Sequence, residues 1–172
     1  MRSHKLNNGF SLIELLLVVA IIGIISAIAV PNLLSSKRAA NEASALAALR
    51  VISSAESTYQ ATTGGGQFAS LAVLRTNSLV DSAVGAATIS GPGTPKLGYL
   101  FSAENISGTA APAFDAKAQP SAHTSTSLIF GTGSRSFFVN EQGVMYFNTT
   151  ATAPTCTTAR VVVPGVGGGV LN

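Results

Sequence analysis

The pattern of hydrophobic and polar positions divides the chain into three parts. Residues 10–30 are almost all apolar, residues 31–62 carry apolar side chains at spacings of three and four, and residues beyond 64 form short alternating runs. A long apolar run predicts a membrane-spanning or buried helix, a spacing of three and four predicts an amphipathic helix, and alternation predicts strands. We therefore expect one long helix from about Phe10 to about Thr62, followed by a β-rich region.

The apolar half of this helix has the length of a membrane span. Residues 10–30 would extend about 31 Å at 1.5 Å per residue, which matches the hydrocarbon core of a bilayer. Glu14 is the only charged residue in this run. A charge in hydrocarbon costs at least about 2.5–3.5 kcal/mol, so Glu14 needs a partner. Gly23 loosens the helix and Pro31 removes the backbone bond to Ala27, so we expect a kink.

The second half of the helix predicts a packing surface. Gly64-Gly65-Gly66 follows it and is expected to end the helix. Arg50 points away from the apolar stripe, whereas Arg38 and Glu56 project close to it and are expected to reach water through their long side chains. The stripe consists of Ala45, Leu49, Ile52, Ala55 and Tyr59.

The C-terminal region predicts a small antiparallel sheet. Residues 136–140 and 144–148 form the clearest hairpin in the chain, in which Gly143 can supply the positive backbone angle of the turn. Further elements are expected as a short helix or turn within residues 71–80 and as strands at residues 97–102 and 114–118.

The two halves of the chain each offer one apolar surface. Packing one face of a meander of three or four strands on the helix stripe would bury both surfaces, which predicts an α+β fold. The polar tail, residues 149–158, and the glycines at 167–169 are expected to lie at the surface or to be poorly ordered.

Composition narrows the functional classes. The net charge is +3, only 10% of residues are charged and no polybasic stripe is present, so we expect no nucleic-acid binding. Cys156 is the only cysteine, so no disulfide can form within the chain. His123 lies in a Ser/Thr-rich stretch and is expected to be a solvated loop residue, while Asp81, Asp115 and Glu141 are scattered singly. We therefore predict no enzyme, no metal site and no cofactor.

The N-terminal segment is open to more than one interpretation. A secretory signal peptide would use Arg2 and Lys5 as its basic region and Ala27-Ile28-Ala29 as its cleavage site. The length of the apolar run and the presence of Glu14 argue against a signal peptide. A plain membrane anchor would need only the length of the run, which does not separate it from the third interpretation.

The third interpretation rests on a short polar leader that ends in Gly9, then Phe10, then Glu14 one helical turn later. This arrangement resembles a type IV prepilin N-terminus, in a family that includes the pseudopilins of type II secretion systems. The resemblance implies that a prepilin peptidase cuts between Gly9 and Phe10 and that Phe10 is then N-methylated. It also implies that Glu14 meets the terminal amine of a neighbouring subunit during assembly, and that the fold is a pilin-like roll.

The resemblance further implies partners and a location. The partners are copies of the chain and related minor pilins, the prepilin peptidase and methyltransferase, an assembly platform and the inner membrane. The precursor would cross the inner membrane once, with its N-terminus in the cytoplasm, and then enter a pilus or pseudopilus. The expected regions are a leader at residues 1–9, a membrane-spanning and filament-core helix at 10–30, an amphipathic helix at 31–63 and a β-rich head at 64–172.

Two alternatives to a type IV pilus subunit, with its roles in adhesion, motility or DNA uptake, stay open. The missing disulfide favours a type II secretion pseudopilin or a minimal pilin, whereas the lack of a recognisable calcium-type C-terminal loop argues against the major pseudopilin. A membrane-anchored or secreted periplasmic binding domain is the alternative from a different functional class.

Overall fold

The computed structural model describes residues 10–106, 109, 111–124, 131–157, 159–165 and 167–171. Contacts divide the chain into two compact units, one ending at Ser36 and one beginning at Lys37. The helices are α1 (Leu12–Ala61), α2 (Leu71–Thr76) and α3 (Ser82–Ala86). The strands are β1 (Tyr99–Ile106), β2 (Ala113–Pro120), β3 (Ser136–Asn140), β4 (Met145–Asn148), β5 (Thr155–Cys156), β6 (Val162–Val163) and β7 (Gly169–Val170).

Helix α1 confirms the predicted long N-terminal helix. It remains helical across Gly23 and Pro31, and the kink expected at these residues stays a prediction. The helix ends at Ala61, shortly before the three glycines, of which Gly65 and Gly66 adopt φ values of 56° and 87°, in the left-handed region that favours glycine. The sequence pattern of polar and apolar residues therefore predicts both the length of α1 and the place where it ends.

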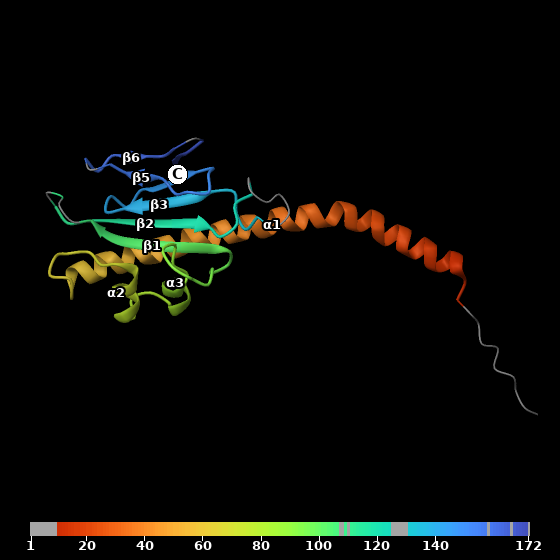
Figure 1. Ribbon diagram of the computed structural model, residues 1–172, viewed down its shortest axis with the longest axis horizontal. Coiled ribbons are helices and arrows are strands. Elements are labelled where there is room, and N and C mark those ends of the chain that lie inside the picture. The colour runs from red at the N-terminus through yellow and green to blue at the C-terminus, as the bar shows by residue number, and fades with distance from the viewer. Residues whose placement is uncertain are drawn as a thin grey trace, which may run out of the picture. The chain divides into compact units, whose positions relative to one another are not determined.

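The main sheet of the C-terminal unit is antiparallel and confirms the α+β fold. Its strand order is β1-β2-β3-β4-β7, and Figure 1 shows β1, β2 and β3 side by side. The predicted hairpin is present, with Phe137 opposite Phe147 and with Gly143 at φ 74° in the turn. The sheet exceeds the predicted three or four strands because Gly169–Val170 pairs with β4.

The core of this unit lies between α1 and one face of the sheet. Leu49 and Ile52 are fully buried, and so are Tyr99, Phe137 and Val139 from the strands. Burying each large apolar side chain contributes about 1.5–3 kcal/mol, so this shared core stabilises helix and sheet together. The predicted stripe of α1 is confirmed as the packing surface, and Arg50 is exposed.

The opposite face of β3 is also covered, although the tail at residues 149–157 lies largely at the surface, as predicted. Every residue of β3 is buried. Ser136 Oγ donates to Thr150 O at 2.6 Å, and Asn140 Nδ2 lies 4.0 Å from Cys156 Sγ. Because Phe137 and Phe138 are adjacent and point to opposite faces, a strand with both side chains buried needs cover on both sides. Residues 149–163, which include β5 and β6, supply that second cover.

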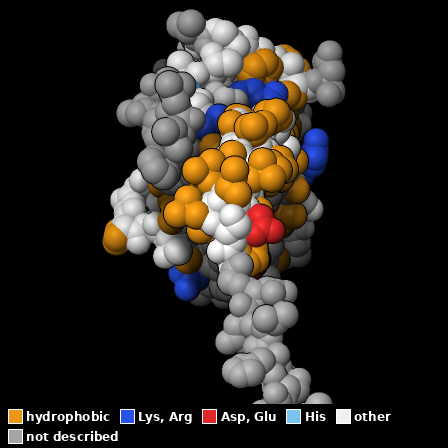
Figure 2. All heavy atoms as spheres, turned by 90° about the vertical axis from the view of Figure 1, so that its right-hand side faces the viewer, with side chains coloured by type: hydrophobic (Ala, Val, Ile, Leu, Met, Phe, Trp, Pro, Cys, Tyr) orange, Lys and Arg blue, Asp and Glu red, His pale blue; other side chains and the backbone are white. Residues whose placement is uncertain are grey.

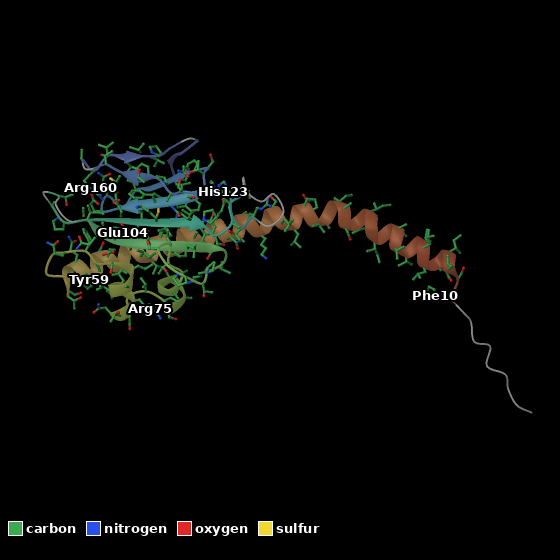
Figure 3. All side chains as sticks on the ribbon, viewed as in Figure 1. Phe10, Tyr59, Arg75, Glu104, His123 and Arg160 are labelled. Carbon is green, nitrogen blue, oxygen red and sulfur yellow. The ribbon has the colours of Figure 1, made fainter. Side chains whose placement is uncertain are left out.

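The predictions for two polar residues, Glu56 and His123, were wrong. Glu56 does not reach water: it is 0% exposed. His123 is not a solvated loop residue, since it is buried and its Nε2 lies 3.0 Å from Ser134 O (Figure 3). In both cases a segment distant in sequence packs over the side chain, which the local pattern does not reveal. Arg38 is half-buried and its Nε donates to Gly131 O.

Candidate functional site

The N-terminal unit presents an uncovered apolar helix surface. Every residue from Phe10 to Leu33 is exposed, and Figure 2 shows hydrophobic side chains gathered along this part of the helix. In the described part of the chain, α1 alone is long and apolar enough to cross a membrane, with a mean hydropathy of 2.9 in its most apolar stretch. So many exposed apolar side chains need cover from lipid or from protein.

Glu14 is a charged residue in the apolar half of α1, and it also caps the N-terminus of this helix. Its Oε2 accepts the backbone N–H of Ser11 at 3.1 Å, and Ser11 directly precedes the first helical residue. Ser11 and Glu14 thus occupy the first and last positions of a capping box, in which the Glu side chain satisfies the cap N–H. The Ser-Leu-Ile-Glu sequence is the signal for this local role, which our sequence reasoning missed. A carboxylate has two acceptor oxygens, so a second partner can still bind.

The predicted processing residues lie at the edge of the described chain. Phe10 is 80% exposed and immediately precedes the helix (Figure 3). Gly9 and the rest of the leader lie outside the described residues. Phe10 and Ser11 directly precede α1 and Glu14 lies in its first turn, while Gly23 and Pro31 lie further along the helix.

Comparison with known proteins bears on this same segment. Residues 4–30 match the family described as the prokaryotic N-terminal methylation motif. The chain carries the prokaryotic N-terminal methylation motif. This confirms the resemblance to a type IV prepilin N-terminus over residues 4–30, while the roles of Gly9, Phe10 and Glu14 stay predictions.

Two curated relatives are similar in sequence to part of this chain. The type IV major pilin of Myxococcus xanthus is 40% identical over 58 residues, which cover 34% of this chain and 26% of the relative. The type IV wide pilus major component of Thermus thermophilus is 52% identical over 42 residues, covering 24% of this chain and 30% of the relative. The chain thus matches less than a third of the length of either relative. No solved structure matches the chain.

Outside the methylation motif, a buried carboxylate joins α1 to the loop before β3. Glu42 Oε1 accepts the backbone N–H of Ser134 at 2.8 Å and its hydroxyl at 2.7 Å, and Oε2 accepts Nε of Arg135 at 2.8 Å. Burial alone would raise the pKa of Glu42, but the bonds from Ser134 and Arg135 outweigh it and hold the pKa below its usual value. Glu42 is therefore an ionised, fully bonded link, and no local sequence pattern indicates it.

Arg160 brings together two carboxylates that the sequence left scattered. Its Nη1 donates to Asp115 Oδ1 at 2.8 Å, its Nε to Glu141 Oε1 at 2.9 Å and its Nη2 to Phe114 O at 2.9 Å (Figure 3). The hydrogen bonds to Glu141 raise the pKa of Arg160. For Glu141, burial acts to raise the pKa, but the bonds from Arg160 prevail and lower it. Arg160 thus ties residues 149–163 to β2 and to the β3–β4 turn.

Among the residues that the structure describes, the remaining candidate ligands lie in separate places. Asp81 pairs with Lys96 at 3.0 Å, Asp115 and Glu141 both bind Arg160, and Cys156 is a free thiol whose pKa is raised by burial. Within the described ranges, no group of three or more His, Cys, Asp or Glu side chains could hold a metal ion.

Replacing Arg160 with methionine should loosen the C-terminal cover of the sheet. The change leaves Asp115 and Glu141 close together without their shared cation, and we expect a loss of about 2 kcal/mol in the free energy of unfolding. Urea denaturation of the full chain in detergent, with limited proteolysis mapped to residues 149–163, measures it. The matched control is Lys96→Met at the more exposed pair with Asp81, where a change below about 0.5 kcal/mol is expected. Equal effects of the two variants would contradict this role for Arg160.

Proposed function

We propose that this chain is a structural subunit of a type IV pilus-like filament. The precursor is cleaved between Gly9 and Phe10 by a prepilin peptidase and N-methylated at Phe10. Before assembly it resides in the inner membrane as a single-pass protein. An assembly platform then packs it against copies of itself and related minor pilins. Residues 10–30 form the filament core, residues 31–63 the amphipathic spine and residues 64–172 the head. The subunit has no catalytic activity of its own.

The observation that carries this proposal is the uncovered apolar helix behind a methylation motif. A helix whose side chains are exposed from Phe10 to Leu33 is unstable in water until lipid or other helices cover it. A bilayer covers it before assembly, and lateral packing of identical helices covers it afterwards. Both environments lack water, so Glu14 needs a cationic partner in the second. The new terminal amine of a neighbouring Phe10 has the right charge.

A pilus is favoured over a secretion pseudopilus by the relatives. One is a type IV major pilin and the other a major component of a type IV wide pilus. Deleting the gene should therefore remove surface filaments while leaving the set of exported proteins unchanged. Loss of exported proteins with filaments intact would favour the pseudopilus instead.

The mature N-terminus should be N-methyl-Phe10. Mass spectrometry of the protein purified from membranes and from sheared filaments measures both the cleavage site and the added methyl group. Cleavage needs a residue without a side chain before the scissile bond, so Gly9→Val is expected to retain the leader, whereas a distant head variant such as Lys96→Met is processed normally. A mature chain that begins at Val30 would instead identify a secreted domain.

A further inference from the structure

The carboxyl group of Glu56 lies in an unusual setting within the head. It is 0% exposed, and its Oε2 accepts the backbone N–H of Ala69 at 2.8 Å. Its Oε1 is buried and has no hydrogen-bond partner among the described residues. A buried carboxylate with one hydrogen bond is costly to ionise, whereas Glu42 on the same helix has all its bonds satisfied. Glu56 therefore does not act as a structural ion pair.

The residue that Glu56 binds belongs to a short connecting segment with a hinge before it. Residues 67–70, which we call the latch segment, form the last part of the connection from α1 to α2. Gly65 and Gly66 precede it with positive φ values and open space around them. Apart from Glu56, the segment is held by Asn105 Nδ2, which donates to Phe68 O at 2.9 Å, and by the Phe68 ring, whose centroid lies 4.8 Å from that of Phe114. Phe68 and Ala69 are buried in the hydrophobic core, so the segment closes the core at the place where Glu56 lies.

We propose that Glu56 is a proton-operated latch that holds the latch segment against α1 while the carboxyl group is protonated and loosens it on ionisation. The opened state hydrates the carboxylate, which the closed state cannot do. Because residues 70–72 form one wall of a pocket whose other walls are residues 88–90 and 101–104, loosening the segment also opens that pocket on one side. The latch thus makes the shape of this head surface depend on pH.

Burial, and not a neighbouring charge, shifts the pKa of the Glu56 carboxyl group. Burial raises the pKa of Glu56 to about 7, and the only opposing influence is the hydrogen bond from Ala69. The latch segment itself contains no charged residue. The titratable and charged groups on the elements around it include Arg50, Tyr59, Arg75, Tyr99, Glu104, Asp115 and Lys117 (Figure 3 labels Tyr59, Arg75 and Glu104), and none of them contributes to this pKa.

The sign of the pH dependence follows from linkage. In the opened state Glu56 returns to its usual pKa near 4.5, while in the closed state it titrates near 7. The closed state therefore binds the proton more tightly, and closure is fully favoured below pH 4.5 and lost as the pH rises to about 7. Above pH 7 both states are ionised, so no further change is expected.

Hydrogen exchange of the full chain in detergent micelles tests the latch. After correction for the intrinsic exchange rate, protection of the amides of residues 67–74 should fall on the order of 50-fold between pH 5 and pH 7.5, while β3 amides keep theirs. Glu56→Gln keeps an acceptor for Ala69 but cannot ionise, so its protection should not change with pH. Glu42→Gln is the matched control and should retain the wild-type pH dependence at residues 67–74.

Two outcomes would overturn the latch. If β3 amides lose protection in parallel with residues 67–74 in the wild-type chain, ionisation of Glu56 weakens the whole head and not a local segment. If Glu56→Gln shows the same pH dependence as wild type, another group is responsible. The first comparison uses only the wild-type protein, so the proposal can be refuted even if the variant does not fold.

Discussion

Replacing Glu14 with valine should abolish or strongly reduce filament assembly while leaving membrane insertion intact. Removing a charge from the apolar run makes insertion more favourable by about 2.5–3.5 kcal/mol. Assembly loses the attraction between the carboxylate and the terminal amine of a neighbour, and a desolvated pair of this kind is worth enough to cut assembly at least about tenfold. Quantifying sheared filaments by electron microscopy, against the amount of subunit in membranes, measures both expectations.

Glu14→Gln is the control that separates the two roles of this side chain. Glutamine can complete the capping box with Ser11 as glutamate does, but it carries no charge. If the amine partner matters, Glu14→Gln should assemble as poorly as Glu14→Val. Recovery of assembly in Glu14→Gln would instead show that the cap is what assembly requires. Normal filament yield from Glu14→Val would contradict both roles.

The parts of the fold that follow from local pattern could be predicted from sequence. The extent of α1, its stripe around Leu49 and Ile52, and the β3–β4 hairpin all depend on residues close together in the chain. The segment proposed to carry processing and assembly is also local, and the motif match lies within residues 4–30. The candidate site could therefore be named before the fold was known.

The errors share a physical cause, which is contact with a segment distant in sequence. Glu56 is buried because Ala69 and the segment around it fold back over α1, and His123 is buried beside Ser134. The Arg160 cluster joins groups that lie 19 and 45 residues away in sequence, Glu141 and Asp115. Strands of two residues, such as β5 and β6, are too short to leave an alternating pattern. Local sequence patterns do not reveal such contacts.

Replacing Glu42 with alanine should produce the largest loss of stability in the head. The change removes the acceptor of two Ser134 donors and of Arg135, so these groups lose bonds to a charged partner at a buried position. We expect a decrease of about 3 kcal/mol in the free energy of unfolding at neutral pH. Urea denaturation of the full chain in detergent measures it. Glu104→Ala is the control, because Glu104 is an exposed carboxylate of the same unit and should change stability by less than about 0.5 kcal/mol.

The pH dependence of the Glu42 effect should have the opposite sign to that of Glu56. The pKa of Glu42 is lowered in the folded chain, so its contribution is present above the usual value of 4.5 and is lost as the pH falls through the lowered value. The difference between wild type and Glu42→Ala should therefore shrink in acid, where the closed state of Glu56 is most favoured. A difference that stays constant to low pH would mean that Glu42 stabilises the head by packing and not as an ionised acceptor. The pKa values of two glutamates on one helix are thus shifted in opposite directions, because only one of them has its bonds satisfied.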